Sequence, residues 1–406
     1  MSANVLVQIV ALALSPIITR LYSPSDFGHL AIFMTIVGLF VIFSTARLEF
    51  AIILPKKNED ANALIKLAFI TSILISFLSF IAVYFFQKSI NSYFKIDIVQ
   101  NWLILIPLTI FFISAFNILS NYNNRLKKYA HLAIGQSILG ISNPLIAIGI
   151  SFQKMIDFGL LKAILFSNFL SVLFLSKNLF KENTLTNNSN MLVILKKYYR
   201  FPMYNMPHAF LNFFSSSLPV FMLTPAFGDY AIGLFTMALG KVFKPINLLG
   251  NSIYQVLSKK IVDDIQAKKP VLHQVTKLIS ALVAIGIIPF ATLFFFAPEI
   301  FSFVFGAEWK QAGIYLQYLL PWLFMVYITG TLSFIPNLLK QHKVALIIEL
   351  VYLVFRFLAL QYGINQNSII LALKSFSIAG FCTLFVTLLW YLFLINKADK
   401  AQLKIE

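Results

Sequence analysis

The sequence predicts an all-α polytopic membrane protein, with twelve transmembrane helices in two parallel-repeat six-helix lobes around a central cleft. Three observations lead to this prediction. The 406 residues are 59% hydrophobic and 12% charged, with a mean hydropathy of +0.83. Apolar runs of about 20 residues, long enough to cross a hydrocarbon core of about 30 Å, recur along the chain. The basic residues between these runs are unevenly distributed.

The apolar runs give the number and positions of the predicted helices. They lie at 2–20, 27–47, 67–86, 102–122, 130–151, 158–176, 203–225, 230–256, 278–297, 312–335, 343–361 and 370–395. The first run has no basic flank and stays apolar past Ala13, so we interpret it as a membrane helix and not as a signal peptide. The missing flank also predicts that Met1 is not the natural start of the chain.

The basic residues predict the orientation. The loops after the second, fourth, sixth, eighth and tenth runs, together with the C-terminal tail, contain 22 Lys and Arg residues, whereas the opposite loops contain six. Basic residues in short loops favour the cytoplasm, so both termini are predicted to be cytoplasmic. This requires an even number of spans, and twelve satisfies it.

A polar stretch divides the chain into predicted domains. Residues 177–202 are expected to form a cytoplasmic linker between an N-lobe, 1–176, and a C-lobe, 203–395, with a cytoplasmic tail at 396–406. The halves share weak internal similarity. Gly28 at the start of the second run corresponds to Gly233 at the start of the eighth. Because each half would contain six helices, the repeats are expected to be parallel.

Several function classes are disfavoured. In a soluble protein, a formal charge of +17 would suggest nucleic acid as a partner. Here most basic residues lie between apolar segments and do not cluster in a soluble domain. Cys382 is the single cysteine, so neither a disulfide framework nor a thiol metal cluster is expected. The sequence contains no phosphate-binding loop, nucleophile elbow or metal-spaced His/Cys set, and we predict no enzyme activity, cofactor or metal.

Four basic residues remain inside predicted spans: Lys241, Lys244, Arg356 and Lys374. A charge at membrane depth usually faces a wet cavity or a partner. Lys241 and Lys244 share a helical face that continues toward the cytoplasm. The residues predicted to line a substrate-binding cleft are Lys241, Lys244, Arg356, Asn251 and Gln255. The alternatives are snorkelling, which also suits Lys374, and a salt bridge with a facing carboxylate.

Acidic and histidine residues suggest ion coupling and a gate. Glu349 is the most deeply placed carboxylate, so it is the candidate for coupling to H⁺ or Na⁺, or else a partner of Arg356 two turns away. His208 and Asn212, spaced i, i+4, could join a relay, although a lone His in a helix is more often a packing residue. Arg47 and Glu49 close the second run, where they form either a gate at the cytoplasmic mouth or a solvated flank.

Four motifs resemble one family. They are SPIITRLYSPSDFG at 15–28, RLEFAIILP at 47–55, YRFP at 199–202 and FGAEW at 305–309. Together they resemble bacterial polysaccharide exporters, the O-antigen flippase branch of the multidrug/oligosaccharidyl-lipid/polysaccharide exporter superfamily. The resemblance covers nearly the whole chain, and Lys241 takes a position where similar proteins often carry a basic residue.

The resemblance implies a flippase of the bacterial inner membrane. It would move an undecaprenyl-diphosphate-linked oligosaccharide, an O-antigen or capsule repeat unit, by alternating access coupled to an ion gradient. Membrane lipids and the polymerase and chain-length components of the export pathway are the implied partners. Positive charge inside the bundle suits a diphosphate headgroup. The alternatives are a multidrug/cation antiporter of the same fold and a membrane-embedded polysaccharide polymerase or polyprenyl-dependent glycosyltransferase.

Overall fold

The computed structural model describes residues 2–95, 102–152, 158–181, 191–267, 269–339 and 341–403. The described residues are helical and contain no β-strand. By their contacts they form two compact units, unit 1 at Met1–Gly233 and unit 2 at Leu234–Glu406. Unit 1 thus includes the segment 203–225, and the division into lobes at 177–202 stays a prediction.

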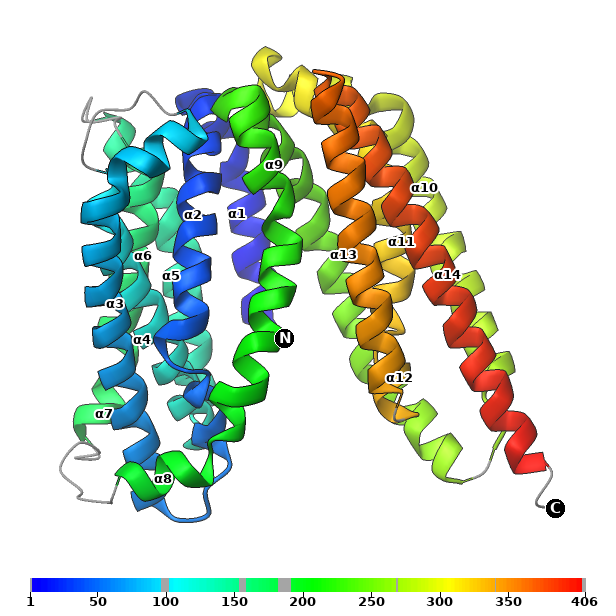
Figure 1. The fold of residues 1–406 in the computed structure, drawn as a ribbon, viewed down its shortest axis with the longest axis horizontal. Helices are drawn as coiled ribbons and strands as arrows, with labels where there is room; N and C mark the ends of the chain where they lie inside the picture. The colour runs from blue at the N-terminus through cyan, green and yellow to red at the C-terminus, as the bar shows by residue number, and fades with distance from the viewer. Residues whose placement is uncertain are drawn as a thin grey trace. The chain divides into compact units, whose positions relative to one another are not determined.

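Unit 1 is a bundle of upright helices (Figure 1). Its helices are α1 (Ser2–Leu21), α2 (Pro24–Ser44), α3 (Asn58–Phe94), α4 (Leu105–Arg125), α5 (Tyr129–Phe152), α6 (Gly159–Leu175), the short α7 (Lys177–Lys181) and α8 (Met191–Lys197), and the first part of α9 (Met206–Gln266). A capping box starts α2, because Ser23 and Asp26 satisfy each other's backbone N–H groups. Helix α4 packs against α2, α3 and α6, so it is central to the bundle.

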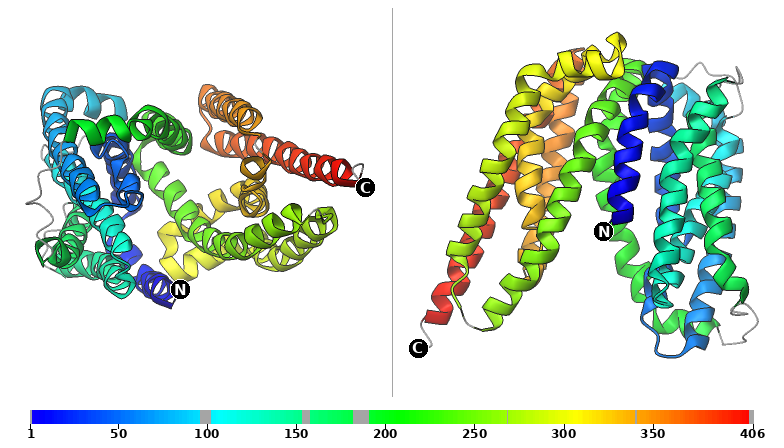
Figure 2. Two further views of the ribbon diagram at one scale, coloured as in Figure 1. Left: turned by 90° about the horizontal axis from the view of Figure 1, so that it is seen from below. Right: turned by 180° about the vertical axis from the view of Figure 1, so that it is seen from behind.

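Unit 2 contains the rest of α9 and the C-terminal helices. These are α10 (Leu272–Phe305), α11 (Lys310–Thr331), the short α12 (Ile335–Leu338), α13 (His342–Asn365) and α14 (Ile369–Leu403). Helix α11 packs against α10 and α14, and α13 packs against α14 (Figure 2). The buried carboxylate of Asp399 accepts hydrogen bonds from the backbone N–H groups of Val271 and Leu272, which satisfies donors at the start of α10.

The number of spans agrees with the twelve predicted helices. Within the part of the chain that the structure describes, ten helical segments are long and apolar enough to cross a membrane. Helix α1 adds a shorter apolar stretch, Val7–Leu21. Helix α9 combines the predicted seventh and eighth spans, which are separated at Gly228, whose φ of 84° and ψ of 174° interrupt the helix. A positive φ of this kind suits glycine because it has no Cβ.

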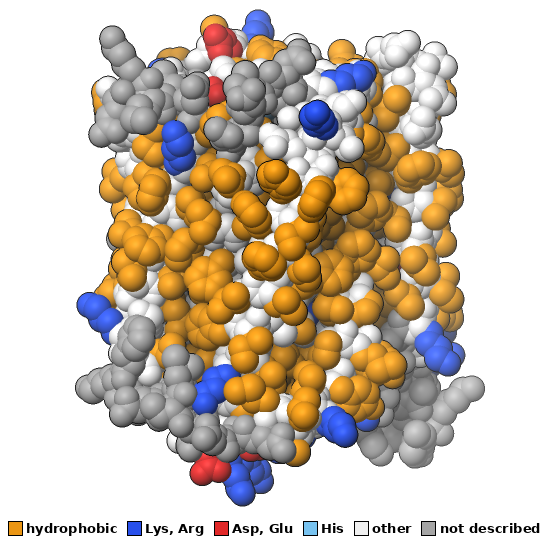
Figure 3. All heavy atoms as spheres, turned by 60° about the vertical axis from the view of Figure 1, so that its left-hand side comes forward, with side chains coloured by type: hydrophobic (Ala, Val, Ile, Leu, Met, Phe, Trp, Pro, Cys, Tyr) orange, Lys and Arg blue, Asp and Glu red, His pale blue; other side chains and the backbone are white. Residues whose placement is uncertain are grey.

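The surface of the bundle is apolar where a membrane would lie. Large side chains such as Phe85 and Phe303 are 73% and 86% exposed. In the face shown in Figure 3, hydrophobic side chains cover the middle and basic side chains lie near the two ends. A soluble protein rarely exposes apolar patches of this extent, because water solvates them poorly. Such a surface is suited to contact with the hydrocarbon chains of lipid. The protein is therefore a multi-pass membrane protein.

Candidate functional site

The candidate site is built on a turn that follows α2. The sequence predicts a helix up to residue 47, but α2 ends at Ser44. Ala46 and Arg47 then adopt left-handed conformations, with φ of 49° and 59°. Non-glycine residues rarely adopt this conformation, which is held only where surrounding contacts determine it. The turn leads into a 3₁₀ helix, η1 (Leu48–Ile53).

The η1 helix is fixed by apolar packing on one face and by hydrogen bonds at its C-terminal end. Leu48, Ala51 and Ile52 are fully buried in an apolar cluster with residues of α3 and α4. Arg125, the last residue of α4, donates from Nη1 to the carbonyl oxygens of Ile52, at 3.3 Å, and Pro55, at 2.6 Å. A guanidinium is suited to this task because its donors form a rigid planar fork. The turn that carries Arg47 is therefore anchored to the bundle.

The carboxyl of Glu49 lies beneath this turn. Glu49 is 2% exposed and accepts a hydrogen bond from the hydroxyl of Thr45. Its Oε1 lies 3.7 Å from Nη1 of Arg47. Glu49 is outside the membrane spans, and burial raises its pKa, a change that the Thr45 hydrogen bond and the Arg47 charge oppose in part. Glu49 is thus a buried acid, and a solvated flank does not describe it.

Arg47 is held by three groups. In addition to Glu49, its Nε donates to Oδ1 of Asn205 at 3.3 Å. Its guanidinium carbon lies 4.8 Å from the centre of the Phe50 ring, within the range of a cation–π contact. These contacts place the guanidinium between η1, which carries Glu49 and Phe50, and Asn205, the residue just before α9.

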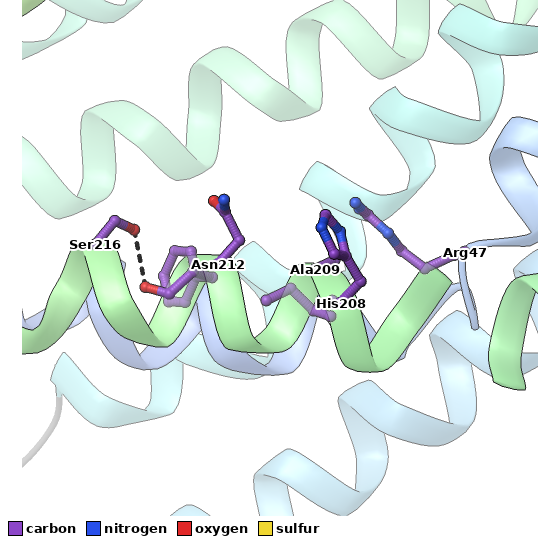
Figure 4. Close-up of a pocket in the computed structure, with 7 residues that line it drawn as sticks. Arg47, His208, Ala209, Asn212 and Ser216 are labelled. Atoms are coloured by element: carbon purple, nitrogen blue, oxygen red, sulfur yellow. Dashed lines mark hydrogen bonds between the residues drawn. The ribbon is translucent and has the colours of Figure 1, made fainter. Parts of the chain in front are cut away.

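Arg47 and His208 line one pocket of about 340 Å³. The lining residues are Ile42, Arg47, His208, Ala209, Asn212, Phe213 and Ser216. Three polar residues of α9, His208, Asn212 and Ser216, are spaced four residues apart, so they share a helical face. Figure 4 shows Arg47 and His208 at one end of the pocket, with Asn212 and Ser216 farther along α9. The structure therefore joins two residues that sequence reasoning had placed in separate roles.

The pocket can bind a polar, anionic group. A guanidinium can donate two parallel hydrogen bonds to a phosphate. An imidazole, a carboxamide and a hydroxyl can donate or accept further hydrogen bonds, as sugar hydroxyls and phosphate oxygens require. Ile42 and Phe213 add apolar surface. The i, i+4 spacing that pairs His208 with Asn212 in the sequence could also have identified Ser216, whereas the approach of Arg47 to α9 is a tertiary contact.

Glu349 lines a second pocket, which lies in unit 2 and has a volume of about 270 Å³. Its lining includes six hydroxyl groups besides the carboxylate: Thr329, Ser333, Tyr352, Thr383, Thr387 and Tyr391. Sequence reasoning identified Glu349 but none of these hydroxyls. The signal available was the spacing of Thr383 and Thr387 on α14, which places them on one face.

Arg356 lies in an aromatic cage formed by Trp322, Tyr352 and Phe376. It is 6% exposed, and its guanidinium carbon lies 5.8, 5.0 and 4.8 Å from the three ring centres. The indole N–H of Trp322 donates to the hydroxyl of Tyr352 at 2.6 Å, which orients two of these rings. Arg356 lines neither the Glu349 pocket nor the Arg47 pocket.

Most of the sequence matches one protein family. A family model described as "Polysaccharide biosynthesis protein" matches residues 17–313. The chain belongs to this polysaccharide biosynthesis family. The resemblance inferred from the four motifs is confirmed, and three of those motifs lie inside the matched range, while the first begins two residues before it.

Solved structures share the fold of this polysaccharide biosynthesis family member. The lipid II flippase MurJ in an inward closed conformation is 17% identical, with a TM-score of 0.73 and coverage of 98% of this chain and 91% of that chain. An inward-facing MATE family multidrug resistance transporter of the MOP superfamily is 15% identical, with a TM-score of 0.67 and coverage of 97% and 96%. No match was found among curated proteins. These two proteins that share the fold are a flippase and a transporter.

Four of the residues predicted to line a cleft, two lysines and two carboxamides of α9, are described only in part. Lys241 is half-buried, and its Nζ lies 5.5 Å from the centre of the Phe305 ring. The side chains of Lys244, Asn251 and Gln255 lie outside the described residues. Their role in a cleft stays a prediction. Among the side chains that are described, no group of three or more His, Cys, Asp or Glu is placed to hold a metal ion.

Proposed function

We propose that the chain is a flippase that moves an undecaprenyl-diphosphate-linked oligosaccharide, an O-antigen or capsule repeat unit, across the bacterial inner membrane by alternating access. The Arg47 pocket carries this proposal, because it offers a positioned guanidinium beside an imidazole and a carboxamide. A diphosphate is costly to remove from water unless charged hydrogen bonds replace its hydration. The family match and the flippase fold support the same substrate class.

The roles of the pocket residues follow from their chemistry. Arg47 binds the diphosphate oxygens, and His208 and Asn212 donate to the same group or to the first sugar. The distribution of basic residues supports a cytoplasmic location for this end of unit 1 and for both termini, and the pocket would then be the cytoplasmic mouth. Lys241, Lys244, Asn251 and Gln255 would then contact the headgroup during its passage. Arg356 would orient the rings of its cage.

Ion coupling is the second part of the proposal. The Glu349 pocket combines a carboxylate with several hydroxyl oxygens, which are the ligands that a hard cation prefers and that a proton relay also uses. Glu349 would therefore couple transport to a gradient of H⁺ or Na⁺. The same pocket, together with the MATE fold, is the observation that favours a multidrug/cation antiporter as the alternative function.

Glycan display at the cell surface tests the proposal. We expect Arg47→Ala and Asn212→Ala to reduce the displayed glycan, normalised to the amount of protein in the membrane, by about tenfold, since a charge-assisted hydrogen bond contributes about 1.5–3 kcal/mol. Lys56→Ala, an exposed basic residue at the same end of unit 1, is the control. Normal display by abundant Arg47→Ala protein would refute the headgroup role of the pocket.

A further inference from the structure

Glu49 faces the same guanidinium that the proposed substrate would bind. Its Oε1 is 3.7 Å from Nη1 of Arg47, and its other oxygen accepts from Thr45. The Glu49 side chain is 3% exposed, whereas the Arg47 side chain is 24% exposed and lines the pocket. Arg47 therefore lies between a buried acid on one side and the binding pocket on the other.

An anion in the pocket would change the electrostatics of this buried acid. An ionised carboxylate that is removed from water depends on nearby positive charge for its stability. A diphosphate bound to Arg47 would draw the guanidinium away and would place further negative charge nearby. Both effects favour the neutral form of the carboxyl, since like charges at short distance disfavour ionisation.

We propose that Glu49 takes up a proton when an anionic diphosphate headgroup binds Arg47, so that headgroup binding and proton uptake are coupled within unit 1. This inference rests on the proposed function and adds to it a coupling residue distinct from Glu349. Glu49 acts through Arg47 and is therefore a positioning residue: ionised, it holds the guanidinium back, and protonated, it releases the guanidinium to the ligand.

The surroundings of Glu49 suit both protonation states. A hydroxyl can donate to a carboxylate and accept from a carboxylic acid, so the contact with Thr45 can persist after protonation. Burial already raises the pKa of Glu49, which brings the carboxyl closer to protonation before any ligand binds.

Other titratable groups are present on the elements packed against η1. The described ones on the first nine residues of α3, on α4 and on the π-helical turn η3 (Phe201–Asn205) are Glu59, Asp60, Lys66, Tyr122, Arg125 and Tyr204, and α3 carries Tyr84, Lys88 and Tyr93 farther along. His208 faces Arg47 across the pocket. Among these groups, the positive charge of Arg47 has the most direct effect on the Glu49 carboxyl, and this charge favours the ionised form of the carboxyl. Withdrawal of this one charge is the event that the proposal requires.

The test is calorimetric titration of the purified full chain with farnesyl diphosphate, a soluble prenyl diphosphate. Titrations in buffers of different ionisation enthalpy, between about pH 5 and pH 8, give the number of protons taken up per bound ligand. We expect the wild type to take up more protons than Glu49→Gln at the same pH. Glu59→Gln, which removes an exposed carboxylate at the same end of unit 1, should behave as the wild type.

The outcomes separate this inference from the proposed function. Equal proton uptake by the wild type and Glu49→Gln, both of which bind the ligand, would overturn the role of Glu49 and leave the headgroup pocket intact. Absence of binding to the wild type would contradict the proposed function and this inference together. If Glu49→Gln does not fold, Thr45→Val serves instead. The Thr45 hydrogen bond lowers the pKa of Glu49, so its loss should move the pH of greatest proton uptake per bound ligand to a higher value. No shift would overturn the inference.

Discussion

Nη1 of Arg125 donates a 2.6 Å hydrogen bond to the carbonyl oxygen of Pro55, and this bond joins the end of α4 to the loop between α2 and α3. Nη2 of the same guanidinium donates to Oδ1 of Asn58 at 3.0 Å, at the first residue of α3. One side chain thus fastens the end of η1 and the start of α3, and so fixes the C-terminal end of the segment that positions Arg47 and Glu49.

Arg125→Lys should weaken unit 1. An ammonium group is a point charge and cannot reproduce the planar fork that bonds several oxygens at once. We expect a loss of roughly 1–3 kcal/mol of stability, seen as a lower unfolding temperature of the purified protein, and weaker binding of farnesyl diphosphate. Arg200→Lys, at an exposed position, is the control. An unchanged unfolding temperature would show that the fork is dispensable.

Gly233→Ala should disrupt the contact of α2 with α9. A Cβ at residue 233 would lie 1.7 Å from the carbonyl oxygen of Pro24, which belongs to the backbone and has little freedom to move. We expect a large drop in the unfolding temperature or in the amount of protein in the membrane. Gly149→Ala is the matched control, because a Cβ there meets no atom within 4 Å. Equal behaviour of the two variants would contradict this close packing.

The sequence predicted most of the fold because its signals are local. Spans can be read from about 20 consecutive apolar residues, and their positions agree with the observed helices, including α10 and α14. The end of α2 at Ser44 was missed, because the left-handed turn depends on burial of Leu48 and Ile52 and on Arg125, which is distant in sequence. The aromatic cage of Arg356 was missed for the same reason, since its rings come from three helices.

Glu49→Gln should change how stability depends on pH. The pKa of Glu49 is higher in the folded protein than in the unfolded chain. The contribution of Glu49 to stability is therefore greatest when the pH is below its pKa in the unfolded chain. This contribution is lost as the pH rises through its pKa in the folded protein. Gln does not ionise. The unfolding temperature of Glu49→Gln relative to wild type should therefore increase as pH rises from about 4.5, and then level off. A difference that does not vary with pH would contradict the raised pKa.

Glu349→Gln should separate transport from its driving gradient. Loss of the carboxylate removes the one formal charge in the hydroxyl-rich pocket, so reconstituted protein should respond less to imposed H⁺ or Na⁺ gradients. Glu308→Gln, an exposed position, should keep the wild-type response. Full gradient dependence in Glu349→Gln would exclude the residue from coupling.

The most direct test of the central claim is translocation of a labelled undecaprenyl-diphosphate oligosaccharide in proteoliposomes, read from the fraction of label that an impermeant reagent can reach. We predict that wild-type protein accelerates transfer between leaflets relative to empty liposomes, and that Arg47→Ala, reconstituted in equal amount, lowers the rate by about tenfold or more. The Lys56→Ala control should transfer the lipid at the wild-type rate. Transfer no faster than in empty liposomes, in the presence of folded wild-type protein, would contradict the account.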